Sequence, residues 1–180
     1  MKPSPPMITP GFDSIAEFEG DWYVAHTKSR FEKSFAEDLR CMGVNYFLPM
    51  REKVYVSSGK KRKSVLPLFT SYVFFCSADP EIKTKVFRTN RIASIMDVVE
   101  RERFVSELSA IEAAIKNDMT LSTVESLPIG QSCRVVSGVM LGTEGVVVEH
   151  LQNKAKVVLE VSVLGKGVEM ELDSSMIEKI

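Results

Sequence analysis

The chain has 180 residues, of which 44% are hydrophobic and 26% are charged, and its formal net charge is −1. A chain of this length can form one medium domain or two small ones, and the composition is that of a folded protein rather than a disordered one. No apolar run approaches the length of a membrane span, and the first residues lack the apolar centre of a signal peptide. We therefore expect a cytoplasmic protein with no membrane association.

The residues that usually carry catalysis or bind metals are sparse. Cys41, Cys76 and Cys133 are far apart and odd in number, which argues against a disulfide framework and against a zinc site. Neither His26 nor His150 has another His or a Cys at metal-ligand spacing, and no Walker, G-x-S-x-G or H-E-x-x-H motif occurs. We therefore expect no catalytic residue, no metal and no cofactor, and we predict that the protein is not an enzyme.

Charge is distributed unevenly along the chain. Residues 1–116 contain 18 Lys and Arg against 15 Asp and Glu, whereas residues 117–180 contain 5 against 9. Most of the basic excess lies in Arg51–Lys63, where six cations accompany one acid. Because nonspecific affinity for nucleic acid depends on neutralising phosphates, the acidic C-terminal region is a poor candidate for that role, and we expect its partner to be a protein.

The first two thirds of the chain alternate between strand and helix patterns. Residues 1–20 contain three early prolines and little periodicity, and we expect them to form a flexible leader. Strand patterns follow at 22–27, 45–56, 68–76 and 92–98, and helix patterns at 29–42, 79–88 and 101–117. This order predicts an α/β sandwich, an antiparallel sheet flanked by helices, over residues 21–117, with residues 57–64 as a cationic loop between strands.

The last third of the chain has a different pattern. Residues 118–127 lack strong periodicity, and we expect them to form a linker. From residue 128 onward, glycines separate short valine-rich runs, among them Val146–Val148 and Val157–Val163. β-Branched runs between glycine turns are typical of strands, so residues 128–180 predict a small SH3-like barrel of four or five strands. The expected fold class is therefore α+β.

Five segments in a fixed order resemble one known family. They are Asp21-Trp-Tyr-Val-Ala-His-Thr-Lys, Arg30-Phe-Glu-Lys, Asn45-Tyr-Phe-Leu-Pro-Met, Pro67-Leu-Phe-Thr-Ser-Tyr-Val-Phe-Phe and the glycine-valine stretch that begins at Gly130. The last is similar to a KOW motif, and the succession resembles the NusG family of transcription elongation and antitermination factors. The resemblance implies an NGN domain over 21–117 and a KOW domain over 128–180.

The resemblance also implies a docking site for RNA polymerase. In the family, an apolar surface that includes the strand at 68–76 docks on the clamp helices of the largest polymerase subunit, bridges the cleft and suppresses pausing. By motif, the candidate contacts are Phe69, Tyr72 and Phe74. Strand alternation places Tyr72 and Phe74 on one face and Phe69 on the other. The alternative is that these aromatic residues only form core.

Two cationic groups are candidate contacts to DNA in the elongation complex. The first is the cluster Lys60, Lys61, Arg62 and Lys63; the alternative is a solvated hairpin tip that prevents aggregation. The second, Lys28, Arg30 and Lys33, surrounds the start of the first helix and extends the same surface.

In the KOW domain, the turn at Val139, Met140 and Leu141 exposes apolar side chains at a corner. The resemblance implies a termination helicase or a ribosomal protein as its partner, and the alternative is burial at a strand edge.

We expect a monomer, and among NusG proteins we favour a specialised, operon-targeted paralogue of the RfaH type over a general housekeeping factor. The leader, the divergent helix region and Thr70-Ser71, where the family often has Pro-Gly or Pro-Asn, favour the specialised form. A ribosomal or RNA-binding KOW protein is a further alternative, but it predicts a basic barrel.

Overall fold

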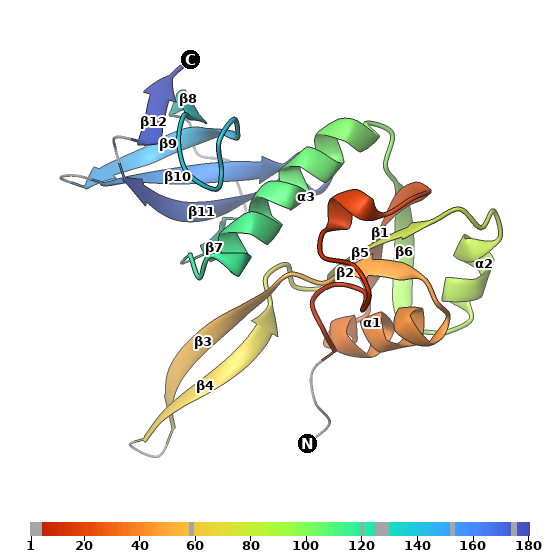
Figure 1. Ribbon diagram of the computed structural model, residues 1–180. Coiled ribbons are helices and arrows are strands. Elements are labelled where there is room, and N and C mark those ends of the chain that lie inside the picture. Colours follow the sequence, from red (N-terminus) through yellow and green to blue (C-terminus); the bar gives the residue numbers. More distant parts are fainter. Residues whose placement is uncertain (1–4, 58–59, 120, 125–129, 152–153, 174–175) are drawn as a thin grey trace. The chain divides into compact units, whose positions relative to one another are not determined.

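The computed structural model describes residues 5–57, 60–119, 121–124, 130–151, 154–173 and 176–180 (Figure 1). Its backbone divides into two compact units, Met1–Arg101 and Glu102–Ile180. The division falls earlier than the expected boundary near residue 117, because it assigns a long helix to the second unit.

The first unit is built on a four-stranded antiparallel sheet with the strand order β2-β5-β1-β6. The strands are β1 (Asp21–Thr27), β2 (Asn45–Phe47), β5 (Tyr72–Ser77) and β6 (Ile92–Asp97), and the helices are α1 (Glu32–Cys41) and α2 (Ile82–Phe87). An antiparallel sheet with helices is the α+β architecture that the strand and helix patterns predict.

Helices α1 and α2 share one hydrophobic core with the sheet. Phe35 and Leu39 of α1 are buried together with Ile82 of α2 and Phe75 of β5. Burying side chains of this size contributes about 1.5–3 kcal/mol each. Met42, the last residue of the predicted helix 29–42, is 38% exposed because it caps the helix instead of lying within it.

The strand side chains that point to the opposite face of the sheet include a second group of aromatic rings. Trp22 and Val24 of β1 are buried on it, and the Trp22 ring stacks on Phe18 with centroids 5.6 Å apart. Phe12 then meets Phe18 edge to face at 5.1 Å. Both faces of the sheet are therefore occupied by large apolar side chains.

Residues 5–20 differ from the flexible leader that the sequence predicts. The Tyr46 amide donates to Thr9 Oγ1 at 2.6 Å, and the Leu48 amide donates to the Met7 carbonyl at 2.7 Å. A short 3-10 helix, η1 (Ile15–Glu17), follows, and Ile15 and Phe18 are buried. Backbone hydrogen bonds and isolated anchors produce no periodicity, which is why the pattern missed this segment. Residues 1–4 lie outside the described part.

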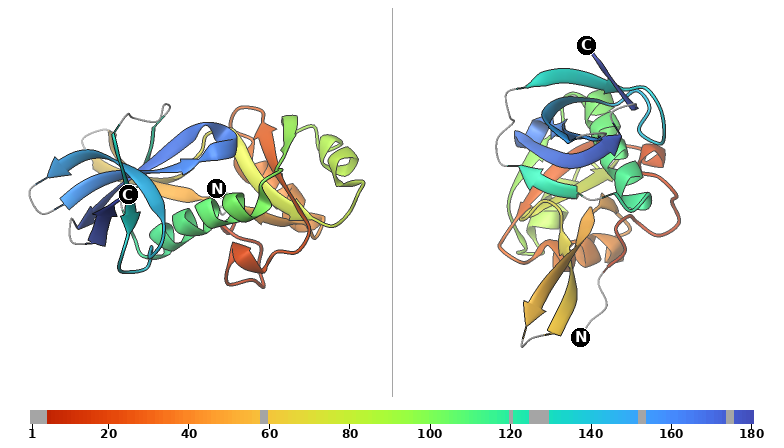
Figure 2. Two further views of the ribbon diagram at one scale, coloured as in Figure 1. Left: turned by 90° about the horizontal axis from the view of Figure 1, so that it is seen from above. Right: turned by 90° about the vertical axis from the view of Figure 1, so that its left-hand side faces the viewer.

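A two-stranded hairpin, β3 (Met50–Ser57) and β4 (Lys60–Pro67), forms a sheet of its own. It extends away from the four-stranded sheet (Figures 1 and 2). The predicted strand 45–56 is thus two strands in different sheets, divided at Leu48 and Pro49, because proline cannot donate to a strand ladder. Lys60–Lys63 lie in β4 instead of the predicted loop, and residues 58–59 lie outside the described part.

The segment between β4 and β5 is a turn, not the first half of a strand. Ser71 adopts a left-handed conformation with φ 66°, and β5 begins only at Tyr72. The Ser71 amide donates to Oε1 of Glu32 at 2.6 Å, and the Ser71 carbonyl accepts from the Thr27 amide at 2.8 Å. Glu32 is only 5% exposed, so a buried carboxylate on α1 holds the turn in place.

The second unit combines helix α3 with a six-stranded antiparallel sheet of order β12-β8-β9-β10-β11-β7. The elements are α3 (Arg101–Lys116), β7 (Leu121–Val124), β8 (Gln131–Val135), β9 (Glu144–Leu151), β10 (Lys154–Val161), η2 (Ser162–Leu164), β11 (Lys166–Asp173) and β12 (Ile177–Lys179). Glu107 of α3 accepts hydrogen bonds from the amide and hydroxyl of Ser162 at 2.9 and 2.5 Å, which ties the helix to η2.

The sixth strand comes from the predicted linker. Leu121–Val124 pairs with β11 from Gly167 to Met170, so part of residues 118–127 belongs to the sheet. Residues 125–129, the remainder of that linker, lie outside the described part. At Gly145, a Cβ would lie 2.7 Å from the Val158 carbonyl oxygen, so close strand packing requires this glycine.

We predict that Glu32→Ala lowers the free energy of unfolding by about 1–3 kcal/mol, because it leaves the part-buried Ser71 amide without its acceptor. Glu32→Gln should cost less, because the amide oxygen can still accept. Glu37→Ala on the same helix removes an exposed ion pair with Arg40 and should cost about 1 kcal/mol at most. Urea titration of the three variants provides the measurement, and equal losses for Glu32→Ala and Glu37→Ala would contradict it.

Candidate functional site

The turn at 68–71 brings two of the three candidate docking aromatics together. Phe69 meets Phe74 edge to face at 5.7 Å, and Phe74 stacks on Phe47 at 6.3 Å. The prediction that Phe69 and Phe74 occupy opposite faces is therefore wrong, because strand alternation does not continue through a left-handed turn. Phe69 is 1% exposed and Phe74 is fully buried.

Tyr72 has a different environment from the two phenylalanines. It pairs directly with His26 across β1 and β5, and the two rings stack with centroids 5.1 Å apart. Both side chains are half-buried, so Tyr72 is the member of the predicted trio that keeps accessible surface. The described site is thus an accessible His26–Tyr72 pair beside a buried Phe69–Phe74 pair.

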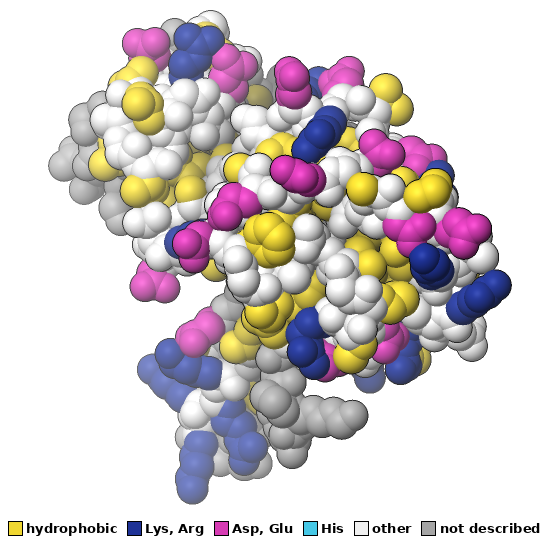
Figure 3. Space-filling view, turned by 45° about the vertical axis from the view of Figure 1, so that its right-hand side comes forward, with side chains coloured by type: hydrophobic (Ala, Val, Ile, Leu, Met, Phe, Trp, Pro, Cys, Tyr) yellow, Lys and Arg dark blue, Asp and Glu magenta, His cyan; other side chains and the backbone are white. Residues whose placement is uncertain are grey.

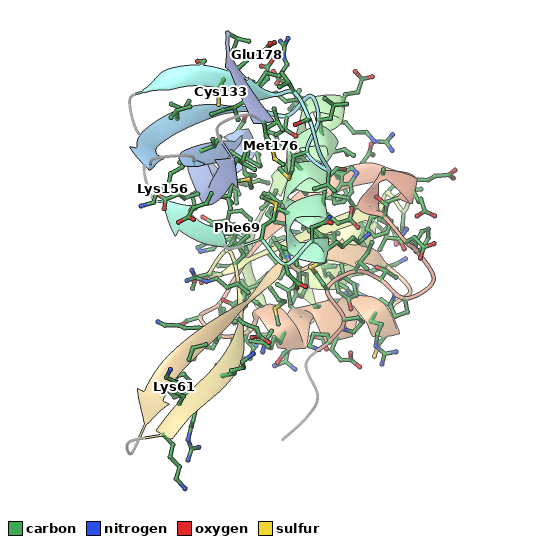
Figure 4. All side chains as sticks on the ribbon, turned by 60° about the vertical axis from the view of Figure 1, so that its left-hand side comes forward. Lys61, Phe69, Cys133, Lys156, Met176 and Glu178 are labelled. Atoms are coloured by element: carbon green, nitrogen blue, oxygen red, sulfur yellow. The ribbon has the colours of Figure 1, made fainter. Side chains whose placement is uncertain are left out.

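The hairpin separates the four predicted DNA-binding cations onto two faces. In the β3–β4 register, Val54 lies opposite Lys63 and Tyr55 lies opposite Arg62. Residues directly opposite share a face, and neighbours along a strand alternate. Lys61 and Lys63 therefore lie on one face, and Lys60 and Arg62 lie on the other. Figure 4 shows Lys61 toward the far end of the hairpin, whereas Phe69 lies where the chain has returned from it.

The face with Lys61 and Lys63 also holds a carboxylate. Lys63 Nζ lies 2.9 Å from Glu52 Oε2, and this hydrogen bond raises the pKa of Lys63. One of the two cations on this face is thus already neutralised by a neighbour. The cations gather visibly over the hairpin in Figure 3, where few acidic side chains accompany them.

The second predicted cationic group is divided between two places. Lys33 Nζ donates to the Val65 carbonyl at 2.6 Å, which places Lys33 at the base of the hairpin. Lys28 Nζ instead donates to Asn90 Oδ1 at 2.6 Å, between α2 and β6. Arg30 is exposed and has φ 66°. The structure thus joins Lys33 to the hairpin and directs Lys28 toward the α2–β6 connection.

Sequence reasoning missed two exposed hairpin residues, Lys53 and Tyr55. Both lie on the same face as Lys60 and Arg62, and Tyr55 is 43% exposed. The alternation of side chains along β3 places Lys53 and Tyr55 on one face. This face can be matched to Lys60 and Arg62 only when residues 60–63 are assigned to the partner strand.

The barrel turn exposes two of its three predicted contact residues. Val139 is 57% exposed and Leu141 is 68% exposed, whereas Met140 is 3% exposed. Gly138 and Gly142, with φ 83° and 85°, bracket the turn, and the Gly142 amide donates to the Val135 carbonyl at 2.7 Å. The corner therefore presents Val139 and Leu141 outward and packs Met140 inward.

Reactive groups are not prominent in the described part of the chain. No group of three or more His, Cys, Asp or Glu among those residues could hold a metal ion. Burial raises the pKa of Cys76 to about 11 and also raises that of Cys133, so both are neutral thiols near neutral pH. The side chain of His150 lies outside the described ones. No helix in the described residues has the length and apolarity to cross a membrane.

Comparison with known proteins identifies the family to which the chain is similar. The chain matches the family described as "Transcription termination factor nusG" over residues 20–115. The transcription termination/antitermination protein NusG of Pseudomonas aeruginosa is 25% identical over 173 residues, covering 88% of this chain and 98% of the relative. The protein of the same name from Borreliella burgdorferi is 22% identical over 180 residues, with the same coverage.

A solved structure, "Domain interaction in Thermotoga maritima NusG", has the same fold with a TM-score of 0.56. It is 18% identical and covers 90% of this chain and 98% of that one. The relatives are transcription factors, which agrees with the prediction of a non-enzyme. Because the family match covers more than half of the chain, this protein belongs to the NusG family of transcription termination and antitermination factors.

Proposed function

We propose that this protein is an elongation and antitermination factor that docks on the clamp helices of the largest RNA polymerase subunit, bridges the polymerase cleft and suppresses pausing. The observation that carries the proposal is family membership over the sheet that holds the aromatic site. We propose that the factor acts as a monomer in the cytoplasm. It works by binding polymerase and does not catalyse a reaction.

The proposed docking surface centres on Tyr72. Its ring is half-buried and supported by the His26 ring at 5.1 Å, so it is a pre-positioned aromatic of the kind that dominates interface energies. Phe69 and Phe74 lie beneath the surface, where they support the site from within. They become direct contacts only if their covering side chains move on binding.

The proposed contact with DNA in the elongation complex uses the hairpin cations. Lys60, Lys61, Arg62 and Lys63 are exposed, and Lys33 extends the surface at the hairpin base. Lys28 donates to Asn90 and not to the hairpin, and Arg30, two residues further along the chain, is exposed, so we propose these two as a second contact. Cations of this kind gain affinity by releasing counterions from phosphates.

The proposed role of the KOW domain is recruitment. Val139 and Leu141 form an exposed apolar corner that suits a protein partner, either a termination helicase or a ribosomal protein. The acidic balance of the last third of the chain supports a protein partner over nucleic acid, because that region would repel phosphates.

Within the family, we propose a specialised paralogue that acts on particular operons, in preference to a general housekeeping factor. Ser71 occupies a left-handed position where glycine is favoured, and a buried Glu32 supports the turn. Serine in place of glycine at this position, together with a carboxylate that supports it, favours a specialised branch of the family. Recovering polymerase with the tagged factor and mapping the transcripts that it occupies tests the choice: a few operons support it, and uniform occupancy contradicts it.

We predict that Tyr72→Ala weakens binding to polymerase core about thirtyfold, because losing a hot-spot aromatic costs about 2 kcal/mol. Tyr72→Phe should keep most of the affinity, because the ring still stacks on His26. Tyr55→Ala removes an exposed aromatic outside the docking surface and should leave binding to polymerase core unchanged. Biolayer interferometry with nucleic-acid-free polymerase measures all three, and unchanged binding by Tyr72→Ala would move the docking surface elsewhere.

We predict that Phe74→Ala acts on stability first. The ring is fully buried against Phe47 and Phe69, so its removal should lower the free energy of unfolding by about 3–5 kcal/mol. Denaturant titration checks this value. Denaturant titration of Tyr72→Ala provides the comparison. If Phe74→Ala lowers the free energy of unfolding by less than Tyr72→Ala does, Phe74 does not act as a core residue.

We predict that Leu141→Asp abolishes recruitment through the KOW domain while binding to polymerase core stays intact. Leu141 is 68% exposed, so the substitution should change stability by about 0.5 kcal/mol or less. Met140→Asp, at the buried neighbouring position, should instead unfold the barrel. Pull-downs with the purified termination helicase and with ribosomes measure recruitment, and full retention of both partners by Leu141→Asp would exclude this corner.

A further inference from the structure

The segment at residues 5–20 covers one end of the sheet face that carries Tyr72. We propose that this segment is a second part of the docking surface, in which the ring of Phe12 contacts a basic, apolar stretch of the polymerase beside the clamp helices. Phe12 and the four carboxylates that follow it in the chain are called the Phe12 surface below: Asp13, Glu17, Glu19 and Asp21. The inference deepens the proposed docking on polymerase and rests on it.

The strand register places the segment and Tyr72 on the same face of the sheet. His26 pairs with Tyr72 across β1 and β5, and Trp22 lies four residues earlier in β1. Side chains alternate along a strand, so Trp22 and His26 point to the same side of the sheet. The Phe18 ring stacks on Trp22 with centroids 5.6 Å apart, and Phe12 meets Phe18 at 5.1 Å. A ladder of three rings therefore extends outward from the face that carries Tyr72.

The size of a protein interface brings the segment within reach of a partner that docks on Tyr72. A specific interface buries about 800 Å² on each partner, which corresponds to a disc of about 16 Å radius. Four residues along a strand span about 13 Å, so Trp22 lies inside a footprint centred on the His26–Tyr72 pair. Trp22 is 1% exposed beneath Phe18, so a partner in that position contacts the segment and not the tryptophan.

The segment is held at both ends and forms a surface before binding. At its start, the Tyr46 amide donates to Thr9 Oγ1 at 2.6 Å, and the Tyr46 hydroxyl donates to the Pro6 carbonyl at 3.0 Å. At its end, Arg101 Nη2 donates to the Phe18 carbonyl at 3.1 Å. A surface that is ordered in advance loses less entropy on association, which favours contact with the segment over its displacement.

The accessible side chains of the segment indicate the chemistry of the partner. Phe12 is half-buried, so it is the accessible end of the ring ladder, just as Tyr72 is the accessible ring of the docking site. Residues 5–21 contain four acidic residues and no Lys or Arg, and all four acidic residues are exposed. Carboxylates repel phosphates and complement cations across an interface. The complementary surface is therefore a basic protein surface and not a nucleic acid.

The first experiment measures amide hydrogen exchange in the full chain, alone and with an excess of nucleic-acid-free polymerase. We expect the amides of residues 5–20 to exchange more slowly in the complex, because the partner covers the segment. Faster exchange at Tyr46 and Leu48, whose amides donate to Thr9 Oγ1 and to the Met7 carbonyl, would show that binding displaces the segment. That result, or unchanged exchange, would overturn the proposal.

The second experiment measures variants of the full chain by biolayer interferometry with the same polymerase. Phe12→Ala should weaken binding about five- to thirtyfold, as truncation of an important interface residue does. Glu19→Gln with Asp21→Asn should slow association at about 0.1 M salt but much less at about 1 M, where the Debye length is about 3 Å. The matched control, Glu37→Gln with Glu81→Gln, removes equal charge from α1 and the start of α2, whose core lies on the other face of the sheet, and should slow association less.

The outcomes separate this inference from the proposed function. If Tyr72→Ala weakens binding but Phe12→Ala leaves it unchanged or makes it tighter, the Phe12 surface alone is overturned. Equal slowing by the two charge pairs would also overturn it, because only long-range charge would then matter. If Phe12→Ala does not fold, hydrogen exchange and the charge pairs decide. A parent chain that does not bind polymerase would contradict the proposed function, and the Phe12 surface with it.

Discussion

The hydrogen bond from the Ser71 amide to the buried Glu32 carboxylate connects the parts of the first unit that matter for function. It joins α1 to the turn that ends the hairpin and starts β5. The same turn accepts the Thr27 amide from β1, so one residue fixes a helix, the hairpin base and the central strands. A buried carboxylate needs such partners, because an unpaired buried charge is costly. Both candidate surfaces therefore depend on this small polar contact.

The turn determines the position of the elements on either side of it. After the turn, β5 places Tyr72 against His26 and buries Phe74, so an accessible ring rests on a rigid support. Before the turn, the hairpin leaves the sheet as a ribbon that contributes little to the core. A ribbon of this kind can change its surface residues at small cost in stability, because few apolar contacts depend on them. Docking and nucleic-acid contact are thus assigned to regions with different tolerance to substitution.

Periodic patterns predicted the regular elements, and they failed where local chemistry interrupts a pattern. The alternation of strand and helix patterns in the first two thirds of the chain and the valine runs of the last third identified both architectures. The turn at 68–71 was predicted as strand, because a left-handed serine leaves no compositional signal and its support comes from Glu32 in a distant part of the chain. The strand at Lys60–Lys63 was predicted as loop, because its charges resemble a turn and only pairing with β3 makes it extended. The N-terminal segment packs through backbone hydrogen bonds, which produce no periodic pattern of side chains in the sequence.

The central claim, that the accessible ring of Tyr72 docks on the polymerase clamp, can be tested by proximity. A photo-crosslinking amino acid at position 72, introduced into the full chain and bound to an assembled elongation complex, reports the nearest polypeptide. The account predicts a crosslink to the clamp helices of the largest polymerase subunit, with the same reporter at position 55 giving none there. A bound factor whose position 72 crosslinks to another subunit, or to no polymerase subunit, would contradict the account.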